Sequence, residues 1–107
     1  MAFKILLAPE AARSLKRLPG HVRAWVKHAI ERHLRHEPRK VSRSRIKRLR
    51  GLRQPQYRLR VGDIGVFHDV TDTDVEILAI VTKAEVQGWL DDRGTADAVG
   101  GTRSGQG

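Results

Sequence analysis

The sequence predicts an α+β domain in which an N-terminal strand and a helical hairpin pack on a mainly antiparallel sheet of four to five strands, with a short helix at the C-terminal end. Apolar residues recur at helical spacing between residues 9 and 35. Between residues 57 and 81 they alternate with polar residues or form a short continuous run. Because the two patterns occupy separate stretches, the strands and the helical hairpin are expected to form separate layers.

The first third of the chain is expected to supply one strand and two helices. Residues 3–8 form a short apolar run that is typical of a strand. Residues 9–18 begin with a proline and a glutamate, which favour a helix start, and a Pro-Gly pair follows them. A second helix is expected over residues 21–35. Its apolar residues lie at helical spacing: Val22, Val26, Ala29, Ile30 and Leu34.

A tight hairpin over residues 57–70 is the most regular pattern in the chain. Arg58 and Arg60 alternate with apolar residues, and a Gly-Asp pair forms a two-residue turn that places Arg60 opposite Gly65. By the same register Arg58 lies opposite Phe67, so both arginines project from one face. The other face requires a core, since it is apolar: Leu59, Val61, Ile64, Val66 and Val70.

Two more strands and a last helix are expected around this hairpin. Residues 46–49 alternate and precede it as a short strand. Residues 75–81 are apolar apart from one glutamate, which is typical of a strand in the middle of a sheet that is covered on both sides. Thr82 can cap a helix over residues 83–92. The expected order of elements is therefore β, α, α, β, β, β, β, α.

Length and composition indicate one small domain. With 107 residues, of which 39% are hydrophobic, the chain is expected to fold over residues 1–92 and to end in a disordered Gly-rich tail over residues 93–107. The chain has no cysteine, which favours a reducing cytoplasm. No apolar run approaches the roughly 18 to 20 residues that span a bilayer, and the N-terminal run is too short for a signal peptide, so no membrane contact is expected.

The charge is concentrated in the middle of the chain. Residues 32–60 carry twelve lysines and arginines against one acid, whereas residues 61–107 carry three against nine. Such a block repels itself unless an anion neutralises it, and phosphate or an acidic protein is the usual partner. A solvated basic surface is the alternative. The residues predicted to contact nucleic acid are Arg43, Arg45, Lys47, Arg48, Arg50 and Arg53.

The histidines predict no metal site. His33 and His36 lie three residues apart with Glu37 next, but no third ligand of matching direction is evident. His68 points the same way along its strand as Val66, so a partly buried structural role is favoured over proton transfer.

Four segments together resemble a known family. They are RLRGL at residues 48–52, YRLRVGDIGVFHDV at 57–70, VEILAIV at 75–81 and KAEVQGWL at 83–90. In this order they are similar to the RelE/ParE superfamily of toxins from bacterial type II toxin–antitoxin modules. The resemblance implies a RelE-like fold, an acidic antitoxin as partner and a toxin–antitoxin hetero-oligomer.

The RelE branch of this family implies cleavage of messenger RNA on the ribosome, without a metal or other cofactor, by attack of the ribose 2′-OH on the adjacent phosphate. Arg58 and Arg60 match a pair of basic residues that hold the RNA backbone, and Lys83 matches a basic residue after the last strand. These three are the predicted catalytic residues. Trp89 falls where a tyrosine is usual and is predicted, together with Arg50, to contact RNA.

Three positions depart from the family pattern. Gly65 stands where an arginine is usual, and losing one such donor costs about 2.7 to 4 kcal/mol of transition-state stabilisation. Trp89 and His68 stand where tyrosines are common, and an indole lacks the hydroxyl that could move a proton. The resemblance therefore implies an attenuated nuclease. Two alternatives stay open: a ParE-like inhibitor of DNA gyrase that acts by protein binding, and a nucleic-acid-binding module without catalysis.

Overall fold

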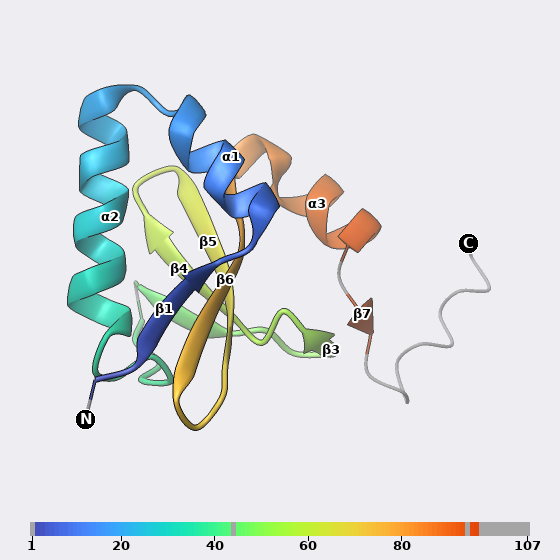
Figure 1. The fold of residues 1–107 in the computed structure, drawn as a ribbon. Coiled ribbons are helices and arrows are strands. Elements are labelled where there is room, and N and C mark those ends of the chain that lie inside the picture. The colour runs from blue at the N-terminus through green and yellow to red at the C-terminus, as the bar shows by residue number, and fades with distance from the viewer. Residues whose placement is uncertain (1, 44, 94, 97–107) are drawn as a thin grey trace.

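The computed structural model describes residues 2–43, 45–93 and 95–96. Helices α1 and α2 lie along one side of a five-stranded sheet, and α3 follows the end of β6 (Figure 1). In chain order the elements are β1 (Lys4–Leu7), α1 (Pro9–Arg17), α2 (Gly20–Leu34), β2 (Ile46–Arg48), β3 (Leu52–Gln54), β4 (Tyr57–Val61), β5 (Ile64–Val70), β6 (Asp74–Thr82), the 3₁₀ turn η1 (Lys83–Glu85), α3 (Val86–Arg93) and β7 (Thr95–Ala96).

The main sheet is mixed, with strand order β1-β6-β5-β4-β2. β1 pairs with β6 in parallel, and the other neighbours are antiparallel. The central position predicted for residues 75–81 is confirmed, because β6 has a strand on each side. The short pair formed by β3 and β7 was not expected from the sequence.

The hairpin of β4 and β5 has the predicted register at every pair. Arg60 lies opposite Gly65 and Arg58 opposite Phe67. Gly62 occupies the turn with φ 59°, in the left-handed region that a side chain makes unfavourable. The ring of Trp25 on α2 covers this turn, since a Cβ on Gly62 would lie 2.6 Å from the ring atom Cη2.

Two cores hold the sheet, one on each face. The larger core joins α1 and α2 to the sheet and includes the apolar hairpin face predicted from the sequence. The smaller core contains Phe67, Ala79 and Val81, with Trp89 and Leu90 of α3 packed against them. Helix α3 covers part of the second face, where Phe67 and its neighbours are buried, in agreement with the predicted sheet that is covered on both sides.

A bulge in β6 allows both cores to be apolar. The pairing with β5 shifts from Phe67↔Ala79 to His68↔Ile77, which leaves Leu78 as an extra residue. The side chains before and after Leu78 therefore point to opposite faces of the sheet. Ile77 packs in the larger core, whereas Ala79 packs in the smaller one.

The predicted helix start at Thr82 is present as a 3₁₀ turn that continues into α3. The Glu85 carboxylate accepts hydrogen bonds from the Thr82 backbone N–H at 3.1 Å and from its hydroxyl at 2.9 Å. The predicted tail begins at Arg93, but α3 includes this residue and residues 95–96 form β7. The rest of that prediction, residues 94 and 97–107, lies outside the described part. Among the described residues, no helix has the length and apolar content needed to cross a membrane.

Candidate nucleic-acid interface

Arg58 and Arg60 project from β4 on the sheet face opposite α1 and α2. Their direction follows from the strand period, because the alternate residues Leu59 and Val61 are buried in the larger core. β2 pairs with β4 so that Lys47 lies opposite Arg58. The second face therefore carries cations on its β4–β2 half and the small apolar core under α3 on its β5–β6 half.

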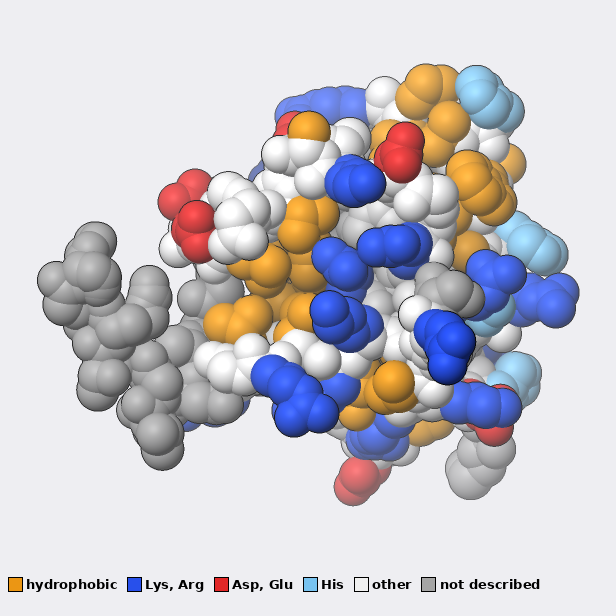
Figure 2. All heavy atoms as spheres, turned by 180° about the vertical axis from the view of Figure 1, so that it is seen from behind, with side chains coloured by type: hydrophobic (Ala, Val, Ile, Leu, Met, Phe, Trp, Pro, Cys, Tyr) orange, Lys and Arg blue, Asp and Glu red, His pale blue; other side chains and the backbone are white. Residues whose placement is uncertain are grey.

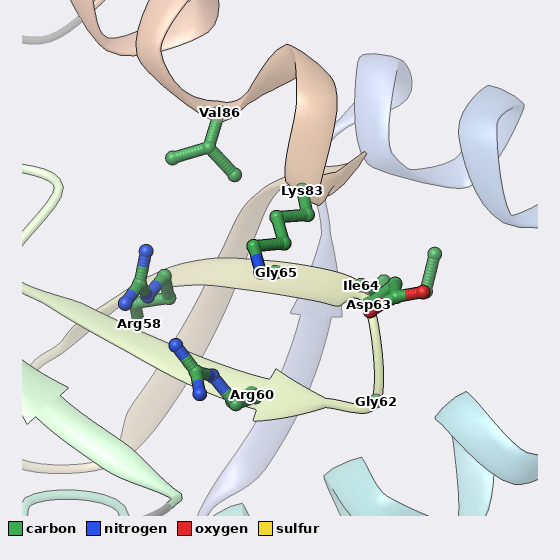
Figure 3. Close-up of a pocket in the computed structure, with 8 residues that line it drawn as sticks. All are labelled: Arg58, Arg60, Gly62, Asp63, Ile64, Gly65, Lys83 and Val86. Atoms are coloured by element: carbon green, nitrogen blue, oxygen red, sulfur yellow. The ribbon is translucent and has the colours of Figure 1, made fainter.

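A shallow pocket of ≈ 80 Å³ lies at the boundary between these halves, and it is named the cationic pocket below. Its floor and walls are Arg58, Arg60, Gly62, Asp63, Ile64, Gly65, Lys83 and Val86. Lys83 reaches the pocket because its backbone N–H donates to the Asp63 carbonyl at 2.6 Å, which ties the start of η1 to the hairpin turn. Figure 3 shows the three cationic side chains, from β4 and η1, reaching over the strands beside Gly65.

Gly65 forms the floor of the cationic pocket and is buried. A Cβ at this position would lie 3.5 Å from Arg58 Cδ and 3.6 Å from both Phe67 Cε2 and Val86 Cγ2. These are ordinary van der Waals distances, and the backbone is outside the left-handed region. The fold therefore accepts a side chain here, although the sequence provides none.

Asp63 lines the pocket, but no ion pair among the described residues joins a carboxylate to the pocket cations. Burial lowers the pKa of half-buried Arg58, and the neighbouring charge of Arg60 lowers it further. The ion pairs within the described residues are Arg35–Glu31 and Lys40–Glu37, and neither involves a pocket cation. Guanidinium groups that are partly desolvated and unpaired favour an anionic ligand.

A second hollow continues this surface toward β2, and it is named the basic hollow. It has a volume of ≈ 280 Å³ and shares Arg58 and Arg60 with the cationic pocket. Three of the predicted RNA-contacting residues line it: Arg43, Arg45 and Lys47. In Figure 2, which views the molecule from behind, Lys and Arg side chains gather over the middle of this face and continue toward one edge.

Three other predicted RNA-contacting arginines line neither the cationic pocket nor the basic hollow. The Arg48 guanidinium donates to the backbone carbonyls of Leu49 and Gln56 and lies 5.3 Å from the Tyr57 ring centroid. It faces the opposite way from Lys47, because consecutive residues of β2 alternate. Arg50 and Arg53 are exposed in the next turn and in β3, and neither lines the hollows.

Trp89, which the resemblance proposed as an RNA contact, is engaged in packing. Its ring stacks on Phe67 with centroids 4.8 Å apart and an interplanar angle of 15°. Its Nε1–H donates to a Glu10 carboxylate oxygen at 2.9 Å. These contacts fasten α3 to the sheet and to α1, and they cover one face of the indole.

His68 is fully buried and lies on the sheet face opposite the cationic pocket. Its Nδ1 is 3.2 Å from the Val66 carbonyl oxygen, and its ring stacks on Tyr57. Burial lowers the pKa of His68. The structural role predicted for this residue is confirmed, with more complete burial than expected.

Sequence reasoning did not identify Asp63 and Val86 as parts of the site. Asp63 is the one acid among the described residues that line the cationic pocket, and Val86 covers Gly65. Asp63 follows Arg60 closely in a tight turn, so its place near the arginines could have been predicted from the sequence. The sequence does not predict Val86 as a site residue, because only the packing of α3 brings it to the pocket. Within the described residues, no group of three His, Cys, Asp or Glu side chains could hold a metal ion.

No family model and no curated protein matches the sequence, but solved structures share its fold. A chain of the RelB–RelE antitoxin–toxin complex from Methanococcus jannaschii superposes with TM-score 0.60 and 24% identity, over 78% of this chain and 96% of that chain. A chain of the RelBE2 toxin–antitoxin complex from Mycobacterium tuberculosis gives TM-score 0.60 and 24% identity, over 77% and 99%. The protein thus has a RelE-like fold, which confirms the predicted fold class.

Proposed function

We propose that this protein is the toxin of a type II toxin–antitoxin module and that it cleaves messenger RNA on the ribosome without a metal. The observation that carries the proposal is the cationic pocket, which Arg58, Arg60 and Lys83 line together without an ion pair to any carboxylate of the described residues. The likeness to chains of antitoxin–toxin complexes supports the toxin role.

The reaction suits these groups. The ribose 2′-oxygen bonds to phosphorus, the bond from phosphorus to the 5′-oxygen breaks, and the products are a 2′,3′-cyclic phosphate and a 5′-hydroxyl. Arg58 and Arg60 bind the non-bridging oxygens, whose negative charge grows in the transition state. The Lys83 ammonium supplies the proton that the 5′-oxygen takes up.

Two features of the pocket favour a modest rate of RNA cleavage. Gly65 contributes no donor to the developing charge. The proton of the 2′-OH needs an acceptor, and Asp63 is the one carboxylate at the pocket wall. A carboxylate is a weaker base than an imidazole at neutral pH, so proton removal is the poorly supported half of the reaction.

The basic face also suits the proposed partner. An acidic antitoxin segment across the cationic pocket and the basic hollow would neutralise Arg58 and Arg60 and exclude RNA. The toxin and antitoxin would then form a hetero-oligomer in the cytoplasm, and loss of the antitoxin would release the activity.

The test is induced expression in a bacterial host, followed by mapping of new 5′ ends on messenger RNA. We expect growth arrest and new ends within translated regions, and we expect Arg58→Ala with Arg60→Ala to abolish both. Arg13→Ala is the matched control, since Arg13 is an exposed cation on α1 that lines neither hollow.

The outcomes separate the three candidate activities. Growth arrest with intact messages and blocked DNA supercoiling would favour the gyrase inhibitor. This alternative is retained because Gly65 provides no donor and the carboxylate at the pocket wall is a weak base. Neither effect, with salt-sensitive RNA binding retained, would favour the non-catalytic module. Either result would contradict the nuclease proposal.

A further inference from the structure

The basic surface does not end at β2. The basic hollow shares Ser42 and Arg45 with a third hollow of ≈ 350 Å³ beside the end of α2, named the α2 hollow. The α2 hollow is lined by Arg32, His33, His36, Glu37, Lys40, Ser42, Arg45 and Ile46. The basic hollow also shares Arg58 and Arg60 with the cationic pocket, so the three hollows adjoin one another in a row, which is named the track below.

We propose that this track binds one continuous single strand of RNA, which runs from the cationic pocket past β2 to the α2 hollow. The inference rests on the proposed action on RNA and adds to it a second phosphate-binding region that is separate from the reacting groups. Arg32 and Lys40 are its distinguishing cations, since they belong to the α2 hollow alone.

The lining of the α2 hollow favours RNA over an acidic peptide. Among the described residues that line the α2 hollow, Ile46 is the one apolar residue. A peptide that binds with useful affinity anchors apolar or aromatic side chains in pockets, and this hollow provides few such surfaces. Arginine is the most frequent residue type along the track, and its planar fork matches phosphate oxygens in two-point contacts.

The α2 hollow has a moderate charge in the free protein. Glu37 forms an exposed ion pair with Lys40 at 3.7 Å, which offsets part of the positive charge. Arg32 and Arg45 have no carboxylate partner among the described ion pairs. A polyanion entering the hollow would therefore gain from two free guanidinium groups and compete with Glu37 for Lys40.

His33 makes this end of the track sensitive to pH. Burial lowers the pKa of His33, and the charges of Arg45 and Arg32 lower it further, so the free protein disfavours the protonated imidazole. A phosphate in the hollow would offset those cations and favour proton uptake. The charged and titratable groups around His33 are His28, Arg32 and His36 on α2, Glu37 and Lys40 after it, and Arg45 before β2.

The test measures binding of the full chain to oligouridylates that carry 2′-O-methyl groups and cannot be cleaved, at lengths of about 4 and about 12 nucleotides. We expect the long oligomer to bind more tightly than the short one. The double variant Arg32→Ala with Lys40→Ala lacks two cations, so the slope of log K against log salt for the long oligomer should become less steep by about 1.4. At ~0.1 M salt the variant should bind the long oligomer about 25-fold more weakly. Binding of the short oligomer should not change.

Two further variants keep the test independent of folding defects. Glu37→Gln removes the competing carboxylate and should strengthen binding of the long oligomer several-fold, which an unfolded variant could not do. Affinity for the long oligomer should rise from ~pH 8 to ~pH 6, and His33→Asn should reduce that rise. Arg13→Ala with Lys16→Ala, two exposed cations of α1, is the control for loss of charge alone.

The outcomes distinguish this inference from the proposed function. If the short oligomer binds at the cationic pocket but the variants at Arg32, Lys40 and Glu37 leave long-oligomer affinity unchanged, the track is refuted and the nuclease proposal survives. If neither oligomer binds at low salt, both fail. If the double variant no longer binds a polyglutamate peptide that the wild type binds, while its RNA affinity is unchanged, the α2 hollow is a protein-binding surface and the inference is wrong.

Discussion

Gly65→Arg is the substitution that most directly tests whether the cationic pocket is an attenuated catalytic site. Position 65 lies opposite Arg60, at the floor of the pocket. A Cβ there meets Arg58, Phe67 and Val86 at 3.5 to 3.6 Å, which are ordinary contact distances, so the first atom of a side chain fits without displacing its neighbours. Its guanidinium would extend into the pocket beside those of Arg58 and Arg60.

The expected effect of the new arginine on folding stability is smaller than its expected effect on the activation barrier. Filling a strand glycine stabilises the fold by roughly 0.5 to 1 kcal/mol. In water, a like charge costs roughly 0.8 kcal/mol at about 5 Å, the spacing of the directly opposite Arg60, and roughly 0.6 kcal/mol at about 7 Å, the diagonal spacing of Arg58. Stability should therefore change by less than about 1 kcal/mol. A donor aimed at the developing charge lowers the barrier by up to about 2.7 to 4 kcal/mol, or roughly a hundred- to thousandfold in rate.

The assay compares wild type, Gly65→Arg, Gly65→Ala and Gly65→Gln. Each is induced at a matched level, the new 5′ ends are counted, and thermal unfolding is followed by circular dichroism. We expect more cleavage for the arginine variant alone, with similar melting temperatures for all four. Unchanged or weaker cleavage by a folded Gly65→Arg protein would refute the reasoning. An equal gain for Gly65→Gln would show that bulk, rather than charge, limits the site.

Three further predictions concern stability. Gly62→Ala should destabilise the fold by roughly 1 to 2 kcal/mol in denaturant unfolding, because φ is 59° and a Cβ meets the Trp25 ring at 2.6 Å. Gly51→Ala, with φ 76° and no atom within 4 Å, should cost less, and equal costs would contradict the role of Trp25. Trp89→Phe should remove the hydrogen bond to α1 and cost about 1 kcal/mol, with faster amide exchange in α3 as the local signature and uniform exchange as the contrary result. Burial lowers the pKa of His68 in the folded chain, whereas an imidazole in the unfolded chain takes up a proton below about pH 6.5. The free energy of unfolding should therefore fall on acidification from ~pH 7, by at most about 1.4 kcal/mol per pH unit from this group, and His68→Phe should flatten the curve.

The hairpin was predictable because its determinants are local. The strand period directs Arg58 and Arg60 to one face, and the turn length sets which residue opposes each of them. The same local rules indicated the helices, the central position of β6 and the helix start at Thr82. A concentration of charge between residues 32 and 60 indicated an anionic partner without showing which of those cations act together.

The selection among the cations required the tertiary structure. Lys47 and Arg48 are neighbours in sequence, yet the pairing of β2 directs Lys47 to the basic hollow and Arg48 to backbone carbonyls on the other face. Trp89 looked equally suited to stacking on a base or on the core, and only the presence of Phe67 and Glu10 beside it gives it a packing role.

The sequence by itself thus determined the order of the helices and of the main-sheet strands, the hairpin with its paired arginines and the basic character of the chain. Only the tertiary structure decided that Lys83 completes the cationic pocket, that Val86 covers Gly65 and that Arg32 and Lys40 prolong the track. The physical reason is the range of the interactions. Strand alternation and turn geometry act over a few residues, whereas the meeting of η1 with the hairpin, or of α2 with β2, depends on how the whole core packs.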